Sequence, residues 1–406
     1  MKQLNISNDG SYFFMMTLLY VICPFLSFVI ALLLFRNRVS QFFFIAFAFY
    51  FGWQVGPNLD LLNHYHNYLR FFDKPFLWAF SDVETLYIGQ EPFHILFKYI
   101  LSLFKAPERV FSGISCAIYS SCFIFYFRQF KSYYRPINLI QFIVLIGAVV
   151  TIEFHWFFGL RFWTGAFVFI AFYLKYITTR NRVYLLLTST CLLFHVVLII
   201  FVGCAVLSEF IKTRKVLYLI LGISFIYRSI DFGFIKFISS LPIVKLFYKS
   251  NFQSSHLQNY LAQKTKDYIE NGNIVYRARL PILLFGIFLS LFLLWTKNKN
   301  LNKVFPKMYG TFLIMIAVAN FGYSDMIFYG RVLKMATLVG YAYLFMVISQ
   351  KENVNTIKSL FVKFIMGGIV LFGLATALVE ERMFLLNIPL WFGNFFTEIP
   401  LLEYNG

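Results

Sequence analysis

Charged residues are scarce in this sequence. Asp, Glu, Lys and Arg together make up 13% of its 406 residues, whereas a soluble domain carries roughly 25%. Hydrophobic residues account for 60%, so the chain has too few polar side chains to cover a globule in water. These proportions exclude an ordinary soluble fold and predict an all-α integral membrane protein whose apolar surface faces lipid.

Cysteine is also rare, and its placement excludes two kinds of site. The sequence has five cysteines, and all of them lie inside apolar runs rather than in loops. There is no CxxC pair and no Cys/His cluster, so neither a disulfide framework nor a zinc site is predicted. We interpret the five as small hydrophobic residues in helix packing: Cys23, Cys116, Cys122, Cys191 and Cys204.

Familiar catalytic motifs are missing as well. The sequence contains no GxxxxGKS/T, GxGxxG, HExxH or GxSxG, which argues against soluble nucleotide chemistry. Asp82 and Glu84 have the spacing of a metal-binding carboxylate pair, but such pairs are frequent by chance and no metal site is predicted. No repeat, heptad pattern or low-complexity linker divides the chain, so residues 1–406 are expected to form a single polytopic membrane domain.

What the sequence has in abundance is long apolar runs. A membrane-spanning helix needs about 20 apolar residues. The first run, 12–35, is too long for the apolar core of a signal peptide, roughly 7–15 residues, and we interpret it as the first transmembrane helix. About ten to twelve transmembrane helices are expected, together with re-entrant or interfacial segments. The candidate spans are 12–35, 40–56, 110–127, 137–152, 162–178, 216–230, 280–296, 309–323, 332–349 and 360–379.

The excess of basic residues indicates how the runs are oriented. The formal net charge is +18, which in a membrane protein indicates basic cytoplasmic loops rather than a nucleic-acid partner. Six short basic clusters are therefore placed in the cytoplasm. They are Arg36/Arg38, Arg128/Lys131/Arg135, Lys175/Arg180/Arg182, Lys212/Arg214/Lys215, Lys297/Lys299/Lys303/Lys307 and Lys351/Lys358/Lys363.

Two neighbouring cytoplasmic clusters must be separated by an even number of crossings. This parity predicts that the short segment 92–104 does not cross, and that 183–211 forms two half-length helices turning near His195. Such re-entrant backbone is tolerated where protein buries it. Both termini then lie outside, as do two long polar segments, 57–91 and 231–279.

The first outer segment gathers groups that transfer protons or hydrogen-bond sugars. It reads Asp60-Leu-Leu-Asn-His64-Tyr65, then Tyr68, and later Glu91. The alternative interpretation is an amphipathic helix that lies at the membrane interface with an aromatic belt. Sequence alone leaves both interpretations open.

Basic and ionisable residues mark further candidate positions. Arg161 and Arg331 each stand where an apolar helix begins, where a guanidinium can clamp phosphate or simply snorkel to lipid headgroups. Arg277 and Arg279, in the outer segment 231–279, suggest an anionic ligand, although long loops also translocate regardless of charge. His195 lies in the middle of the apolar run 183–211. It is either a functional residue or a neutral side chain that is hydrogen-bonded to a neighbouring helix.

At these residues the sequence resembles the O-antigen and exopolysaccharide polymerases of the Wzy/EpsG-like family. Asp60-Leu-Leu-Asn-His64-Tyr65 resembles the Asp-and-Tyr motif of this family. Glu91-Pro-Phe, followed by a short apolar stretch, resembles the feature that comes next along the family's chain. Gly-Leu-Arg161 is similar to its Gly-(Ile/Leu)-Arg-Gln signature, with Phe162 in place of Gln. Leu-Phe-His195 matches its Phe-His motif but lacks the small polar residue that often follows, and Gly-Arg331 resembles its late Arg.

This resemblance implies a GT-C-like glycosyltransferase of the bacterial inner membrane whose site faces the periplasm. Such enzymes move a growing glycan from undecaprenyl pyrophosphate onto a new lipid-linked repeat unit, beside membrane lipid and a chain-length regulator. Neither a cofactor nor a metal is needed if arginines hold the pyrophosphate. The implied roles are a base (Asp60, His64 or Glu91), pyrophosphate binding (Arg161 and Arg331, with Arg277 and Arg279 in reserve) and sugar binding or support (Tyr65, Tyr68, His195).

Two other functions compete with this one. An O-antigen ligase performs the same chemistry on a lipid A acceptor, although the Asp60 motif in the first outer segment fits a polymerase better. A lipid-linked oligosaccharide flippase would be a transporter, and transporters usually show halves related by a repeat, which this chain lacks.

Overall fold

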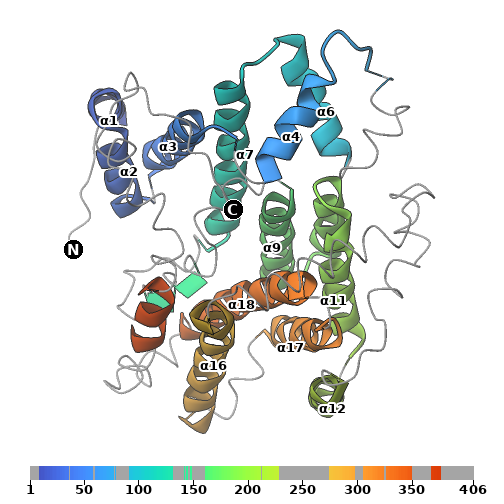
Figure 1. Ribbon diagram of the computed structural model, residues 1–406. Helices are drawn as coiled ribbons and strands as arrows, with labels where there is room; N and C mark the ends of the chain where they lie inside the picture. The colour runs from blue at the N-terminus through green and yellow to red at the C-terminus, as the bar shows by residue number, and fades with distance from the viewer. Residues whose placement is uncertain are drawn as a thin grey trace. The chain divides into compact units, whose positions relative to one another are not determined.

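The structure, a computed structural model, is helical throughout the part of the chain that it describes. The described residues are 9–35, 37–57, 60–76, 78, 91–130, 141, 143–144, 147–148, 161–211, 213–227, 274–297, 305–323, 326–349 and 367–375 (Figure 1). They contain no strand. The chain divides into unit 1 (1–128, 154–167, 381–406) and unit 2 (129–153, 168–380), and each is described by itself.

Three helices are long and apolar enough to cross a membrane by length and composition. They are α7 (Glu108–Arg128), α9 (Phe162–Thr179), and residues Phe328–Ile348 of α18 (Met326–Ile348). The prediction of an all-α membrane protein is thus confirmed at this level. Several other helices contain shorter apolar stretches among the described residues, and the expected total of ten to twelve spans stays a prediction.

The first apolar run, 12–35, was expected to cross the membrane once, and this expectation is wrong. The run forms two short helices, α1 (Asp9–Ile22) and α2 (Pro24–Leu33). Tyr12, in α1, hydrogen-bonds Ser40 at 2.8 Å, while the carbonyl of Phe35, after α2, accepts a bond from Gln41 at 3.0 Å. Both ends of the run therefore meet the first turn of α3 (Arg38–Val55), so the run is a hairpin.

Proline explains where this hairpin turns. Pro24 has no backbone N–H and a fixed φ, which suits the first position of a helix and interrupts the interior of one. The residue before it, Cys23, is extended, with φ −149° and ψ 90°. Because the hairpin returns, residue 9 lies at the same end of unit 1 as Arg38, whereas the sequence predicted opposite faces of the membrane for the N-terminus and Arg38.

Helices α3 and α7 pack closely and in opposite directions. The guanidinium of Arg128, at the end of α7, donates a 2.7 Å hydrogen bond to Gln41 at the start of α3. Farther along, Gly52 lies so close to α7 that a Cβ would sit 2.6 Å from the Ser112 carbonyl oxygen. Arg38 and Arg128 thus share one end of unit 1, as the charge pattern predicted.

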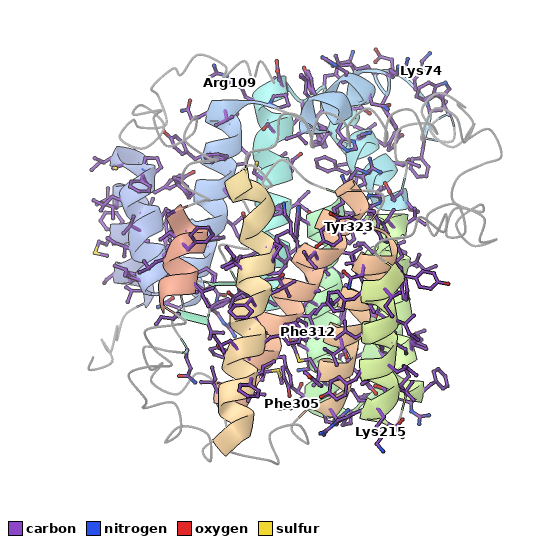
Figure 2. The ribbon with its side chains drawn as sticks, turned by 60° about the horizontal axis from the view of Figure 1, so that its bottom comes forward. Lys74, Arg109, Lys215, Phe305, Phe312 and Tyr323 are labelled. Carbon is purple, nitrogen blue, oxygen red and sulfur yellow. The ribbon has the colours of Figure 1, made fainter. Side chains whose placement is uncertain are left out.

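The opposite end of unit 1 carries two short helices, α4 (Asp60–Leu69) and α6 (Pro92–Leu103). Both pack near the beginning of α7 (Figure 1), and Lys74 and Arg109 also lie at this end (Figure 2). With 12 residues, α6 is about 18 Å long, well short of the ~30 Å hydrocarbon core. Its length agrees with the prediction that 92–104 does not cross.

In unit 2, the run 183–211 returns to its starting end, as predicted. It forms α10 (Arg182–Leu187), two short 3-10 helices, η4 (Thr188–Leu193) and η5 (Val196–Leu198), and α11 (Ile199–Phe210). The break falls at His195, whose backbone is extended (φ −160°, ψ 119°). After it the chain reverses, so that α11 packs back against η4.

Polar contacts fix both ends of this hairpin to one end of unit 2. Glu209, at the end of α11, lies close to Tyr176 near the end of α9, only a few residues before α10 begins. Lys307, at the start of α17 (Pro306–Phe321), donates to the carbonyl of Glu209 at 2.8 Å. The Tyr173 hydroxyl lies 2.6 Å from Thr311 in the same helix. These contacts hold α9, α11 and α17 together.

The same end of unit 2 carries further basic residues. The hydroxyl of Tyr218, in α12 (Arg214–Tyr227), lies 3.3 Å from that of Tyr309 in α17. Figure 2 shows Lys215 and Phe305 at this end and Tyr323 at the other. Helix α16 (Ile274–Lys297) packs against α18, which is buried along nearly its whole length.

We expect Gly52→Ala to destabilise unit 1, because the added methyl group would press on the α7 backbone. Overpacking of this kind costs about 1–3 kcal/mol. Gly10→Ala is the matched control, since a Cβ at Gly10 meets no atom within 4 Å. Thermal unfolding of the purified protein in detergent should show a lower Tm for Gly52→Ala alone. Equal Tm values for the two variants would contradict the close α3–α7 packing.

The hairpin makes a second prediction, which concerns sidedness. In a protein whose native cysteines are replaced by alanine, Gly10→Cys and Lys74→Cys should react with a membrane-impermeant maleimide from opposite faces of the membrane. A single crossing by 12–35 would instead put both cysteines on the same face. Labelling of intact and inverted membrane vesicles distinguishes the two outcomes.

Candidate functional site

A buried ion pair joins two residues that lie far apart in the sequence. Glu91 precedes α6 with an extended backbone (φ −68°, ψ 145°), and Arg161 directly precedes α9. A guanidinium Nη of Arg161 lies 3.2 Å from Glu91 Oε1, and their side chains are 15% and 4% exposed. Both belong to unit 1. Removing one partner of a buried pair typically costs about 3–5 kcal/mol, because a charge is left uncompensated.

Two imidazole rings stack beside this pair. His64, on α4, and His94, on α6, have ring centroids 5.3 Å apart and planes inclined by 15°. Each is only 1% exposed. Burial, and then the neighbouring His64, lower the pKa of His94 well below its usual value, and Glu91 only partly opposes this shift. His94 is therefore a neutral imidazole near pH 7, able to exchange a proton but not to supply a fixed positive charge.

A second cation belongs to the same cluster. Lys98 lies one turn after His94 on α6, is 2% exposed, and is close enough to influence the His94 imidazole electrostatically, as Arg161 also does. Glu91, His94 and Lys98 are spaced i, i+3 and i+7, so they share one face of the helix. We call Glu91, Arg161, His64, His94 and Lys98 the charged cluster.

Sequence reasoning named three members of the charged cluster and missed His94 and Lys98. The segment 92–104 was treated only as a short apolar stretch. The signal was nevertheless present, because three polar residues at helical spacing on one face of an apolar helix indicate a buried polar site.

A polar side chain on α4 adds to the site. Asn67 lies one turn after His64, so it faces the same side of α4, and it is 3% exposed. Within the described part of the chain, neither its amide nitrogen nor its amide oxygen has a hydrogen-bond partner. Buried amides of this kind are usually satisfied by water or a ligand. The surroundings of the histidine pair thus offer hydrogen bonds as well as charge.

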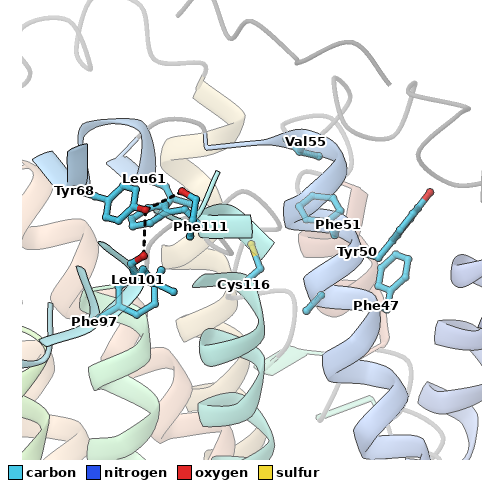
Figure 3. Packing of buried hydrophobic residues seen from close by; sticks show 12 residues of the cluster. Phe47, Tyr50, Phe51, Val55, Leu61, Tyr68, Phe97, Leu101, Phe111 and Cys116 are labelled. Carbon is cyan, nitrogen blue, oxygen red and sulfur yellow. Dashed lines mark hydrogen bonds between the residues drawn. The ribbon is translucent and has the colours of Figure 1, made fainter. Parts of the chain in front are cut away.

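Tyr68 has a structural position rather than an accessible one. Its side chain is fully buried, and its hydroxyl donates to the carbonyl of Ala106 at 2.8 Å, with Leu101 at 3.4 Å (Figure 3). The ring packs on Phe111 at 5.0 Å. Burial, with Tyr65 nearby, raises the pKa of Tyr68 to about 12. This geometry ties α4 to the turn between α6 and α7, and it does not favour the expected sugar contact.

Tyr65 is more accessible. It is half-buried, and its ring lies 5.7 Å from that of Tyr68 and 5.6 Å from that of Phe111. Burial and the nearby Glu108 carboxylate raise the pKa of Tyr65 above its usual value, so its hydroxyl stays protonated at neutral pH. Of the two tyrosines, Tyr65 is the better candidate for contact with a sugar.

The remaining predicted site residues are distributed as follows. Asp60 begins α4, but its side chain lies outside the described residues. Arg331 lies in the second turn of α18, not at its start, because the helix begins at Met326. The expectation that Arg277 and Arg279 lie in a loop is also wrong, since α16 begins at Ile274; their side chains lie outside the described residues.

His195 and Arg331 belong to unit 2, whereas Asp60 and Arg161 belong to unit 1. His195 is 6% exposed at the turn of its hairpin. The cavity predicted to be shared by Asp60, Arg161 and Arg331 therefore stays a prediction. No group of three or more His, Cys, Asp or Glu side chains suited to a metal ion occurs among the described residues.

The placement of Tyr68 can be tested against that of Tyr65. Tyr68→Phe should leave the Ala106 carbonyl without its donor, which costs about 1–3 kcal/mol, and should lower Tm without affecting ligand contacts. Tyr65→Phe should leave Tm nearly unchanged. Equal Tm values, or selective loss of product in Tyr68→Phe at unchanged Tm, would contradict a structural role for Tyr68.

No protein-family model, no curated protein and no solved structure matches this chain.

Proposed function

We propose that this protein is a glycosyltransferase that polymerises undecaprenyl-pyrophosphate-linked oligosaccharide repeat units into O-antigen or a related surface polysaccharide. The observation that carries the proposal is the buried charged cluster of unit 1. Arg161, Glu91 and His64 are separated by up to 97 positions, yet they come from three of the five segments in which the sequence resembles the polymerase family.

The chemistry of the proposed reaction calls for the groups found in this cluster. Leaving of the donor sugar develops negative charge on a pyrophosphate, and a pre-placed cation stabilises that charge. Arg161 supplies a planar guanidinium suited to two phosphate oxygens. The acceptor hydroxyl must lose a proton, for which a neutral imidazole or a carboxylate within about 3 Å is suitable. His64, Glu91 and Asp60 are the candidate bases, and Tyr65 the candidate sugar contact.

The location of the cluster supports the proposed orientation. It lies on α4, α6 and the start of α9, whereas Arg38 and Arg128 lie at the opposite ends of α3 and α7 from α4 and α6. If the basic end faces the cytoplasm, the cluster faces the periplasm. We therefore propose a multi-pass protein of the bacterial inner membrane with a GT-C-like arrangement of about ten to twelve crossings. Its partners are the lipid-linked donor and acceptor, membrane lipid and a chain-length regulator.

The cluster itself fits a ligase as well as a polymerase, since both reactions release a lipid pyrophosphate. Deletion in the native host followed by a lipopolysaccharide gel distinguishes them. A polymerase deletion should leave lipid A core that carries a single repeat unit. Loss of every repeat would instead indicate a ligase or a flippase and would refute this proposal.

The arginines give the sharpest test of the proposal. Arg161→Lys keeps the charge but cannot form the planar bidentate pair, so we expect polymer to be lost or strongly shortened while the amount of protein in the membrane stays normal. The rate should fall roughly 100-fold or more, which corresponds to a few kcal/mol of lost transition-state stabilisation. Arg331→Lys should behave in the same way.

Arg70→Lys is the matched control, because Arg70 is an exposed arginine in the turn that follows α4 of the same unit. It should give a wild-type ladder. Wild-type ladders from Arg161→Lys and Arg331→Lys would instead show that these arginines only snorkel, and would remove the proposed pyrophosphate clamp.

A further inference from the structure

The ion pair that supports the proposed function also poses a problem for it. One carboxylate oxygen of Glu91 lies 3.2 Å from a guanidinium nitrogen of Arg161, a donor that a phosphate oxygen would also use. Carboxylate and phosphate bind a guanidinium through the same fork geometry. The pair is buried, so water screens the two charges only weakly. An incoming anion must therefore compete with Glu91 for Arg161.

We infer that Glu91 is an internal competitor that occupies the anion site, and that the diphosphate of the lipid-linked donor displaces its carboxylate from Arg161. This inference rests on the proposed function and adds a control step to the same site. Once displaced, Glu91 faces a diphosphate of like charge, which favours its protonation. Donor binding is thus coupled to proton uptake by Glu91.

The other groups around Glu91 are compatible with this exchange. On α6, Lys98 is a further buried basic side chain beside His94. His94 on α6 and His64 on α4 are buried, and His94 stays neutral because of that burial. Arg161, directly before α9, is the group that changes partner. Among these residues Glu91 is the only carboxylate, and its proton uptake adds to any that the neutral His94 imidazole makes when the diphosphate arrives.

This exchange narrows the choice of catalytic base. A protonated Glu91 cannot accept the proton of the acceptor hydroxyl while the donor is bound. The base is then His64 or Asp60, and His64 is already held within the site by stacking on His94. In the protein without donor, Glu91 keeps the Arg161 guanidinium oriented. When the donor binds, the Glu91 carboxylate leaves Arg161.

Binding of a short-chain isoprenyl diphosphate sugar to the purified protein tests the inference. This probe is a diphosphate diester, so its phosphates stay ionised throughout the neutral range and take up no proton themselves. At pH 7.5, Glu91→Gln should bind it at least about tenfold more tightly than the wild type, because the competing charge is gone. The ratio of the two affinities should approach one as the pH is lowered and Glu91 becomes protonated in the wild type.

Calorimetry in two buffers of different ionisation enthalpy provides the second readout. The wild type should take up more protons on binding the probe than Glu91→Gln does, and the difference reports Glu91, because the imidazoles of the cluster are the same in both proteins. If Glu91→Gln is unstable, the probe should raise its Tm by more than it raises that of the wild type, because the diphosphate replaces the missing partner of Arg161.

Asp73→Asn is the matched control, since Asp73 belongs to an exposed ion pair with Lys105 in the same unit (77% and 61% exposed). It should leave the affinity for the probe unchanged. Equal or weaker binding by Glu91→Gln would overturn the inference and make Glu91 a positioning residue for Arg161. That result would leave the proposed function standing, because the polymer ladder tests the proposed function and the binding measurements test the exchange.

Discussion

The cost of placing charge in hydrocarbon governs this structure. A charged side chain at the centre of a bilayer costs several kcal/mol unless it is paired or reaches water, and the chain has few charges to place. In unit 1, Arg38 and Arg128 gather at one end of the α3–α7 pair, where Arg128 bonds Gln41. In unit 2, Lys307 and Glu209 pair at one end, beside the last turns of α9. The middle of the long helices is left to apolar contacts.

The charged cluster departs from this separation, as does Lys334, which is buried within α18, and the composition of the cluster explains why it is tolerated. Its charges are buried but lie within reach of one another, with Arg161 and Glu91 in direct contact. Its two imidazoles stack on each other, and burial keeps His94 neutral by lowering its pKa. A buried pair contributes little to stability compared with apolar packing, so its presence in an otherwise apolar protein indicates a functional requirement. The proposed requirement is the binding and release of an anion.

Charge and length predicted much of the fold. The break at His195 followed from parity alone, since two basic clusters flank one long run and must lie at the same end. The same argument could not find the hairpin at Pro24, because no basic cluster precedes residue 9 to reveal the return. Apolar periodicity is similar in a spanning helix and in two short helices, so Pro24 was the one local signal of the break. Proline alone does not prove a break, because Pro281 lies inside the intact helix α16.

The site was predicted less completely than the fold. Glu91, Arg161 and His64 were found because they lie in short polar segments that resemble a known family. Lys98 and His94 were missed because their neighbours in α6 are mostly hydrophobic, so the composition of the segment indicated only a short apolar stretch. The partner of Arg161 could not be derived either, since a contact between positions 91 and 161 depends on how α6 and α9 are placed in three dimensions.

The hairpin of α1 and α2 has a consequence for the order in which the protein assembles during synthesis. Each of its helices is shorter than the hydrocarbon core is thick, and their hydrogen bonds to neighbours are to α3, through Tyr12 with Ser40 and Tyr20 with Ala46. The two helices therefore gain these hydrogen bonds only after α3 has been made. Until then they can pack against each other, so we expect the hairpin to become stable in the membrane together with α3 rather than before it.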